Sequence, residues 1–404
     1  MKKYFLAALV LVLGLQARAS EMKKLSDREY QDRLRGGFVG QMAGVTFAAP
    51  YEFRADGAVI PEDLVRDWQP SMIKGALIQD DIYVELTFLQ SIEKYGIDVS
   101  PEQIGKDFGA SKYPLWHANK WGRDNIRKGI MPPASGHPRY NAHADDIDFQ
   151  IESDMFGLVS PGMPKAAQEF GWRFGHVMNY GDGVYGGVFI SAMYSAAFFE
   201  SDRVKVVESG LAAIPSESNY AKTIRDVLAA YQKNPDDWQY AWSVIEKNWG
   251  DKVHCPSPQL IAFWRKVGIG ANVNGAYVVI AFLYGGGDPV KTMRIAAMEG
   301  RDADCNSSSA MGILGTVIGF DKLPADFKSA LPSMKGKKFA FTNYDCDGAI
   351  NALYQTAQKV LIQQGGRIEG GSWNIPAQSP ASLPLEQWPY GTPGKDIPLP
   401  YGNN

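Results

Sequence analysis

Residues 300–319 read GRDADCNSSSAMGILGTVIG, and the fold can be argued outward from this stretch. Asp302 and Asp304 are acidic residues of the kind that favour a helix start, where they cap the backbone and complement the helix dipole. The small residues that follow allow a helix to pack closely against a neighbour, and Gly319 is a typical helix end. We therefore predict a closely packed helix over residues 306–319, preceded by two carboxylates.

Helical periodicity also dominates the rest of the chain, whereas alternating strand-like runs are scarce. Prolines or acidic residues open many of these segments and glycines close them. The other predicted helices span roughly residues 25–46, 80–95, 101–109, 164–177, 186–200, 203–213, 217–233, 236–249, 270–284, 288–299 and 347–364. Phe339–Phe341 is a weak strand candidate. The pattern predicts an all-α fold, with a single large helical domain over residues 20–364.

The composition is that of an ordinary globular chain. Of 404 residues, 45% are apolar and 12% aromatic, which is enough apolar surface to offset the entropy lost on ordering and excludes a disordered chain. The formal net charge of -3 offers no electrostatic case for a nucleic-acid partner. The three cysteines are too few for a disulfide scaffold, although Cys255 and Cys346 could pair and leave one thiol over.

The first residues predict export from the cell. Lys2 and Lys3 precede the apolar run 4–15, and residues 17–19 (ARA) form a small-x-small cleavage site. This pattern is typical of a secretory signal peptide over residues 1–19, and the run is shorter than the roughly 20 apolar residues that span a bilayer. We expect a periplasmic or secreted protein with no membrane insertion after signal cleavage. The sequence leaves the oligomeric state open.

Two stretches depart from the helical pattern. Residues 110–163 form an insertion whose aromatic content favours order, and residues 365–404 are expected to form an extended strap, because Trp373 and Trp388 favour burial. A solvated loop face is the favoured interpretation of the insertion's acids, which are Asp145, Asp146, Asp148, Glu152 and Asp154. Its aromatic residues could stack on a sugar or base, but core packing is favoured for Trp116, Trp121 and Tyr140.

A second acidic pair, Asp80 and Asp81, follows Gln79 at the start of the helix predicted over residues 80–95. Either acidic pair alone is explained by helix capping. If the two helix starts converge, however, they provide four hard oxygen ligands, which suit one or two divalent cations such as Mg²⁺, Mn²⁺ or Ca²⁺. Zinc prefers His and Cys, and the five histidines show no clustered ligand spacing. Phosphate-loop and Gly-x-Ser-x-Gly motifs are absent from the sequence.

Four segments, in order, resemble motifs of the ADP-ribosylglycohydrolase family. Residues 40–53 (GQMAGVTFAAPYEF) are similar to its Gly-rich first helix and the Pro-x-Glu-Phe that follows. The Asp80-Asp81 pair resembles its Thr-Asp-Asp-Thr metal motif, and residues 300–324 resemble its Gly-x-Asp-Thr-Asp-Thr helix with a short exit segment. Residues 181–187 stand where the family has a Gly-Asn-Gly loop. Order and spacing agree over roughly residues 30–325.

The resemblance implies a dinuclear Mg²⁺ site and cleavage of an N- or O-glycosidic bond to ribose, in a small-molecule or protein-linked glycoside. The residues at the family's metal-site positions are Gln79, Asp80, Asp81, Asp302, Asp304 and Cys305. Catalytic roles in accepting or donating a proton are expected for Glu52, Asp81 and Asp304. The loop residues expected to contact the distal ribose or its phosphate are Asp182, Gly183 and Tyr185.

The sequence also departs from the family motifs at ligand positions. Gln79 and Cys305 stand where the family has threonines, and a thiol is a poor ligand for a hard ion. We therefore expect a divergent, exported relative in which one metal position is weakened or lost. Three functions stay open: hydrolysis of an ADP-ribosyl or related ribosyl bond, hydrolysis of a non-nucleotide glycoside on the same scaffold, and non-catalytic binding of a sugar or nucleotide by a pseudoenzyme.

Overall fold

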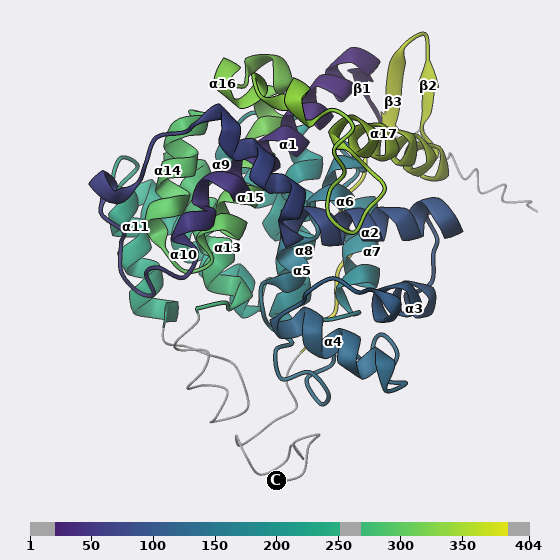
Figure 1. The fold of residues 1–404 in the computed structure, drawn as a ribbon, viewed down its shortest axis with the longest axis horizontal. Coiled ribbons are helices and arrows are strands. Elements are labelled where there is room, and N and C mark those ends of the chain that lie inside the picture. The colour runs from purple at the N-terminus through teal and green to yellow at the C-terminus, as the bar shows by residue number, and fades with distance from the viewer. Residues whose placement is uncertain (1–20, 251–267, 387–404) are drawn as a thin grey trace, which may run out of the picture.

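Two helices that are far apart in the sequence lie side by side at the centre of the fold. The computed structural model describes residues 21–250 and 268–386, and in it α1 (Asp27–Ala48) packs along α15 (Ala303–Ile318) (Figure 1). α15 begins three residues earlier than predicted, so Asp304 stands in its first turn. The central pair therefore joins the first helix of the chain to the second acidic motif.

Glycines on both helices allow this close packing. A Cβ added to Gly40 would lie 2.4 Å from the carbonyl oxygen of Met311, and one added to Gly315 would lie 2.1 Å from that of Gly36. Both distances are well inside van der Waals contact, so even alanine would push the backbones apart. The small residues noted in the sequence thus set how closely α1 and α15 approach.

Longer helices surround the central pair, and those predicted from the sequence all appear with ends shifted by a few residues. On one side lie α10 (Asn219–Lys233), α11 (Trp238–Ile245) with the π-helical turn η4 (Glu246–Gly250), α13 (Ala271–Tyr284) and α14 (Pro289–Glu299). On the other side lie α7 (Pro164–Gly175), α2 (Asp80–Tyr95), α3 (Pro101–Ala110) and α17 (Cys346–Gln363), whereas α8 (Asp182–Ala197) packs between α7 and α9 (Arg203–Ala212), and α9 lies toward α10 and α13. The predicted all-α class is confirmed.

Short helical turns connect the longer elements. They are η1 (Ala49–Tyr51), η2 (Glu62–Leu64), η3 (Pro70–Ile78), η5 (Phe320–Lys322), α16 (Ala325–Lys328) and η6 (Leu331–Met334). The strand predicted at Phe339–Phe341 is wrong, because these residues form a turn between η6 and α17.

The insertion 110–163 is more helical and more buried than expected. It contains α4 (His117–Arg127), α5 (Asp148–Ile151) and α6 (Asp154–Leu158), of which α5 and α6 pack against α8. The solvated loop face predicted for its acids is wrong, since four of them are buried: Asp146, Asp148, Glu152 and Asp154. Core packing is also wrong for Trp116, which is 52% exposed.

A small antiparallel sheet joins the two ends of the described chain. Its strand order is β1 (Met22–Ser26), β3 (Ser372–Pro376), β2 (Arg367–Glu369). Trp373 lies opposite Leu25, is completely buried, as expected for it, and donates its indole N–H to Asp27 over 2.8 Å.

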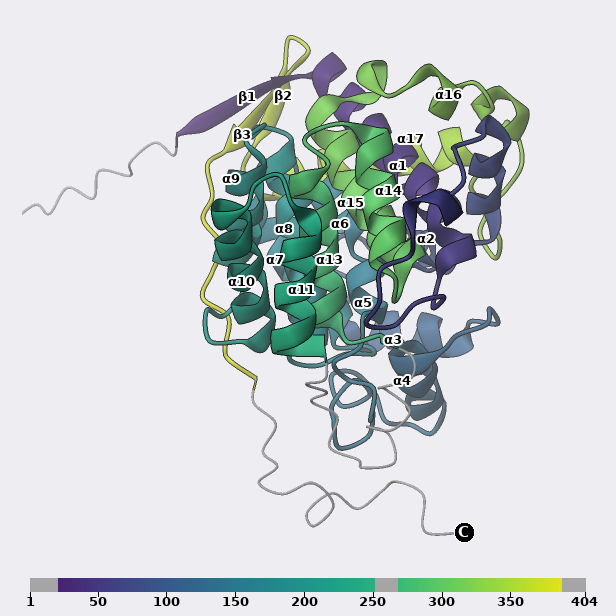
Figure 2. The same cartoon turned by 90° about the vertical axis from the view of Figure 1, so that its left-hand side faces the viewer.

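From this sheet the C-terminal segment, residues 377–386, runs down the body past α7 and α8 (Figure 2). Gln168 of α7 exchanges two hydrogen bonds with the backbone of Ala381. The predicted signal peptide, Trp388 and Cys255 with its suggested disulfide lie outside the described residues.

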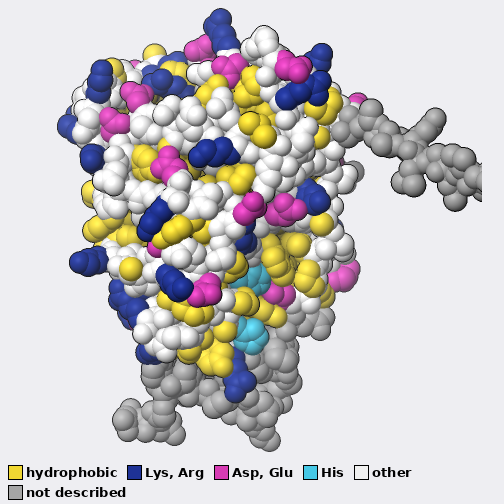
Figure 3. All heavy atoms as spheres, turned by 90° about the vertical axis from the view of Figure 1, so that its right-hand side faces the viewer, with side chains coloured by type: hydrophobic (Ala, Val, Ile, Leu, Met, Phe, Trp, Pro, Cys, Tyr) yellow, Lys and Arg dark blue, Asp and Glu magenta, His cyan; other side chains and the backbone are white. Residues whose placement is uncertain are grey.

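None of the described helices has the length and hydropathy needed to cross a membrane. On the face drawn in Figure 3, basic and acidic side chains are interspersed, and histidine side chains reach the surface among hydrophobic ones.

Candidate active site

The two acidic helix starts converge on one cavity. α2 begins with Asp80 and Asp81, and α15 begins directly after Asp302. A cavity of about 290 Å³, hereafter the acid cavity, lies between them. Six residues predicted from the sequence line it: Glu52, Gln79, Asp80, Asp302, Asp304 and Cys305. Asp81 lies behind the wall, completely buried, where its carboxylate accepts a hydrogen bond from the Cys305 thiol over 3.5 Å.

The backbone near Glu52 is fastened to the turn that precedes α15. Phe53 donates its N–H to the carbonyl of Arg301 over 2.8 Å, and Arg301 donates its own N–H to Ala55 over 2.6 Å. Phe53 and Arg301 both have positive φ, 52° and 54°, which costs a non-glycine residue on the order of 1 kcal/mol. The Arg301 guanidinium anchors the turn through an ion pair with Glu246 at 2.8 Å. Glu52 is thereby held beside Asp302.

Helix capping does not explain the buried acids. Asp302 precedes α15 as its N-cap residue, but its side chain makes no capping hydrogen bond. Within the described chain, Oδ1 of Asp81, of Asp302 and of Asp304 has no hydrogen-bond partner. A buried acceptor without a partner costs about 1–3 kcal/mol, and more when it is charged. A hard divalent cation would supply the missing partner, so these residues fit the predicted Mg²⁺ site.

The same crowding shifts the acids' proton affinity. Burial raises the pKa of Asp304 to about 6, with a further contribution from the charge of Asp80. Burial, followed by the charges of Asp304 and Asp80, raises the pKa of Glu52 to about 8, although the residue as a whole is exposed at the cavity mouth. Burial also raises the pKa values of Asp81 and Asp302 well above their usual range. A bound cation would favour the ionised carboxylates.

The two departures from the family motif behave differently. Gln79 directs its backbone carbonyl to the N–H groups of Ile82 and Tyr83, at 3.2 and 3.0 Å, and lines the cavity wall. Burial raises the pKa of the Cys305 thiol well above its usual range, so the sulfur stays protonated and donates to Asp81. A protonated thiol is a poor ligand for Mg²⁺, whereas an amide oxygen is an acceptable one.

The insertion forms another wall of the acid cavity, which the sequence did not indicate. Asp148 lines it and accepts the N–H of Asn119 over 3.0 Å, and burial raises the pKa of Asp148 to about 7. Trp116, His117 and Asn119 line it as well. The acidic run 145–154 was the available signal for this wall, but composition alone could not separate a buried acid from a solvated one.

The residues expected to contact the distal ribose lie elsewhere. Asp182 and Tyr185 line a second cavity of about 350 Å³, together with Asp145 and Glu386, and we term it the strap cavity. Tyr185 donates its hydroxyl to the carbonyl of Pro384 over 2.9 Å. The segment 145–148 separates the two cavities, since Asp145 lines one and Asp148 the other.

Gly183, the third residue of this set, is buried in the first turn of α8, where an added Cβ would lie 2.4 Å from the side chain of Asn179. Substrate binding by these residues stays a prediction.

The histidines show no clustered ligand spacing in the sequence, yet two of them meet in the fold. His117 and His143 come together around Asp146 beside the acid cavity, and their potential ligand atoms lie within 4.8 Å of one another. The loop between α4 and α5 produces this arrangement, which no local spacing in the sequence reveals.

Comparisons with known proteins agree with this architecture. Among solved structures, the chain is similar to one described as an ADP-ribosylglycohydrolase-related protein complex, with a TM-score of 0.50 and 18% identity. The likeness covers 82% of this chain and 99% of the other, and at this identity it shows a common fold. No protein with a curated description matches the chain. The sequence profile of one family matches residues 26–360, a range that includes every wall of the acid cavity, and the chain therefore belongs to the ADP-ribosylglycohydrolase family.

Proposed function

We propose that this protein is a divalent-metal-dependent hydrolase that cleaves an N- or O-glycosidic bond to ADP-ribose or a related ribosyl group. The observation that carries the proposal is the convergence of four carboxylates on the acid cavity, those of Glu52, Asp80, Asp302 and Asp304, with Asp81 buried directly behind its wall. Membership of the family supports hydrolysis of a glycosidic bond. The unpartnered oxygens of three of these acids support dependence on a cation.

The four aspartates, with the amide oxygen of Gln79, would hold Mg²⁺, and Mn²⁺ would suit the same oxygen donors. The bound cation would supply Lewis-acid polarisation of a ribose oxygen or a water. Because Cys305 is bonded to Asp81 and protonated, we expect it to support that ligand rather than to bind the ion.

Glu52 and Asp304 suit complementary proton-transfer roles. In the metal-free protein, with pKa values of about 8 and about 6, Glu52 is mainly protonated at neutral pH while Asp304 is mainly ionised. Glycosidases commonly need one carboxyl group that donates a proton to the leaving group and one that assists the attacking water. We expect Glu52, at the mouth of the cavity, to donate the proton to the leaving group, and Asp304, in the wall, to assist the attacking water.

Exposed aromatic residues at the acid cavity can hold a flat substrate group. Trp116 is 52% exposed and Phe53 is 39% exposed, and both line the cavity. Large aromatic side chains left open at a cavity are suited to stacking on a sugar or a base. These two residues are therefore our candidates for the contact to the ribose or to the leaving group.

The test measures product release in Mg²⁺ and in excess EDTA. ADP-ribosyl-arginine and ADP-ribosyl-serine peptides are assayed beside nitrophenyl glycosides. We expect Mg²⁺-dependent release of ADP-ribose, abolished in Asp80→Asn, with Asp321→Asn as a control because Asp321 is an exposed acid far from the cavity wall. Activity that survives EDTA would refute the metal dependence. Activity on nitrophenyl glycosides alone would refute the substrate and support the non-nucleotide glycosidase.

A further inference from the structure

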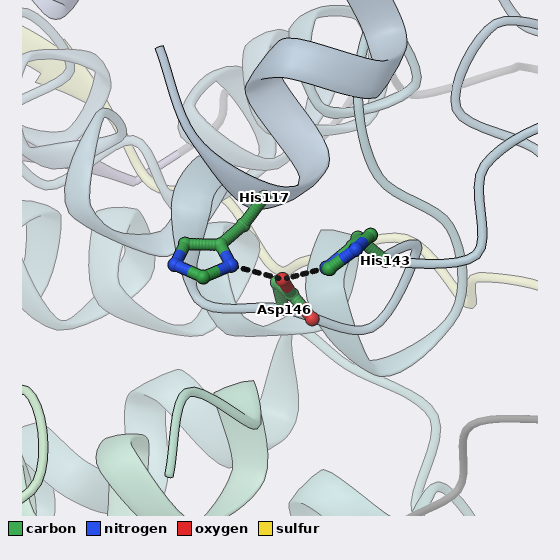
Figure 4. Close-up of side chains that lie close together, drawn as sticks. All are labelled: His117, His143 and Asp146. Atoms are coloured by element: carbon green, nitrogen blue, oxygen red, sulfur yellow. Dashed lines mark hydrogen bonds and ion pairs between the residues drawn. The ribbon is translucent and has the colours of Figure 1, made fainter. Parts of the chain in front are cut away.

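The histidine cluster has the composition and spacing of a transition-metal site. His143 and His117 direct Nδ1 to the same oxygen, Oδ2 of Asp146, over 3.1 and 3.9 Å, from opposite sides of that carboxylate (Figure 4). Two ligand atoms on a tetrahedral zinc ion, each bonded at about 2.0–2.1 Å, lie about 3.3 Å apart. The Asp146–His143 distance is close to that separation, the Asp146–His117 distance is longer, and the three ligand atoms all lie within 4.8 Å of one another.

Hydrogen bonds of the surrounding backbone hold the cluster in place. His143 donates its N–H to Oδ1 of Asn141 over 2.9 Å, and the Asn141 amide donates to the carbonyls of Ala118 and Met178 over 3.0 and 2.7 Å. The same asparagine thus orders the loop that carries His143 and ties it to the residue after His117. A metal site needs ligands ordered in this way before the ion arrives.

The other two ligands are fixed as well. Asp146 donates its N–H to the carbonyl of His143 over 3.1 Å and accepts the amide of Asn179 at its own carbonyl over 2.9 Å. His117, the first residue of α4, has φ of 41°, a backbone conformation that is unfavourable for a non-glycine residue. The fold holds this strained residue so that its ring faces Asp146.

We propose that His117, His143 and Asp146 form a second metal site, for an ion of the zinc class and separate from the oxygen-only Mg²⁺ site. Imidazole nitrogen suits Zn²⁺ and Co²⁺, whereas Mg²⁺ prefers oxygen. The three ligands found among the described residues fill three of the four positions of a tetrahedral ion. The Asp146 side chain is 1% exposed and that of His117 is 20% exposed, so the site opens on the His117 side.

The site lies at the edge of the acid cavity because His117 belongs to both. An ion there would fasten the insertion wall that carries Trp116 and Asn119 to the loop before α5. The same contacts are compatible with a hydrogen-bonded His-Asp-His cluster that holds no metal, and the experiment separates the two.

The experiment titrates Co²⁺ and Zn²⁺ into the chelator-stripped full-length protein in saturating Mg²⁺, with calorimetry and the visible spectrum of Co²⁺ as readouts. We expect one zinc-class ion per chain and the absorption bands of tetrahedral Co²⁺. His143→Ala and Asp146→Asn should each weaken the affinity by at least about tenfold. His137→Ala serves as the matched control, because His137 is a histidine of the same insertion outside the cluster, and it should bind normally.

Asp304→Asn should leave the Co²⁺ spectrum unchanged, which separates this site from the acid cavity. His117→Gln provides a variant at the more exposed ligand, should the buried substitutions prevent folding as judged by circular dichroism. The proposal is overturned if Mg²⁺-saturated wild type gives no tetrahedral Co²⁺ spectrum. It is also overturned if folded His117→Gln and His143→Ala bind as wild type does, or if Asp304→Asn removes the bands.

Discussion

The acid cavity and the strap cavity lie on either side of residues 145–148, yet their polar groups are paired very differently. In the acid cavity, carboxylate oxygens of Asp302 and Asp304 have no partner in the described chain. In the strap cavity, the Glu386 carboxylate accepts the N–H of Gly181 over 2.7 Å and pairs with His176 at 2.8 Å. In the described chain, the acid cavity thus leaves carboxylate oxygens without partners, whereas the protein itself supplies partners for Glu386 in the strap cavity.

This difference indicates separate roles for the two cavities. A buried charge without a partner is costly, so a fold that keeps several of them together is expected to gain a compensating ligand. In the strap cavity the partners come from the C-terminal segment, whose Pro384 and Glu386 both form hydrogen bonds with the Tyr185 hydroxyl. Such contacts stabilise the fold. We expect substitutions in the acid cavity to change chemistry, and substitutions in the strap cavity to change stability.

The largest effect is expected for Asp304→Asn. Loss of one ligand charge and of the ionised partner of Glu52 should lower kcat by at least about a hundredfold, while the melting temperature measured in EDTA is kept or rises. Steady-state kinetics with saturating Mg²⁺, next to thermal unfolding, measure both quantities. A folded variant with more than about a tenth of the wild-type kcat would contradict the role given to the acid cavity.

The metal-free protein should lose stability as the pH rises. The folded state holds protons on Glu52, Asp148 and Asp304 up to pKa values of about 8, 7 and 6, whereas the unfolded chain releases them near pH 4. The folded state therefore binds more protons, and the free energy of unfolding falls as the pH rises from about 4 to 8.

Mg²⁺ should reverse this loss, because it binds the ionised carboxylates and adds about 2.7 kcal/mol at a hundred times its Kd. Thermal unfolding from pH 5 to pH 9 in EDTA and in Mg²⁺ measures the effect. A metal-free protein whose stability increases over this range would show that the acids are already compensated by other groups.

A substitution in the strap cavity should change the stability of the fold and leave the activity nearly unchanged. Glu386→Ala leaves the N–H of Gly181 and Nε2 of His176 without their partner, so we expect a loss of about 1–3 kcal/mol in the free energy of unfolding and a nearly unchanged kcat. Glu369→Ala is the matched control, because this exposed acid of the same C-terminal region pairs with Arg367 at the surface. A large fall in kcat for Glu386→Ala would make the strap cavity part of the active site.

The smallest effect is expected on Mg²⁺ affinity, for substitutions of Cys305, which stands where the family has a threonine. Cys305→Thr places a hard oxygen beside Asp81 and should tighten Mg²⁺ binding by less than about tenfold. Calorimetry compares it with Cys305→Ala, which removes the sulfur without adding an oxygen and should not tighten binding. Equal affinities in the two variants would show that this position does not contact the ion.

Local patterns predicted the helices and both acidic pairs, because periodicity and capping act over a few residues. The walls of the site depend instead on contacts between residues that lie far apart in the sequence. His117 and His143 meet through a loop whose path no local pattern encodes, and the burial of Glu152 and Asp154 depends on the packing of α5 and α6 against α8. The burial of Trp373, by contrast, could be predicted from its large apolar side chain alone.

Anomalous scattering from a crystal grown with Mn²⁺ tests the central claim most directly, because it locates the ion rather than its consequences. We predict anomalous density in the acid cavity within about 2.0–2.3 Å of carboxylate oxygens of Asp80, Asp302 and Asp304, with the density lost in Asp304→Asn. A well-ordered crystal at saturating Mn²⁺ with no density among these aspartates would contradict the account.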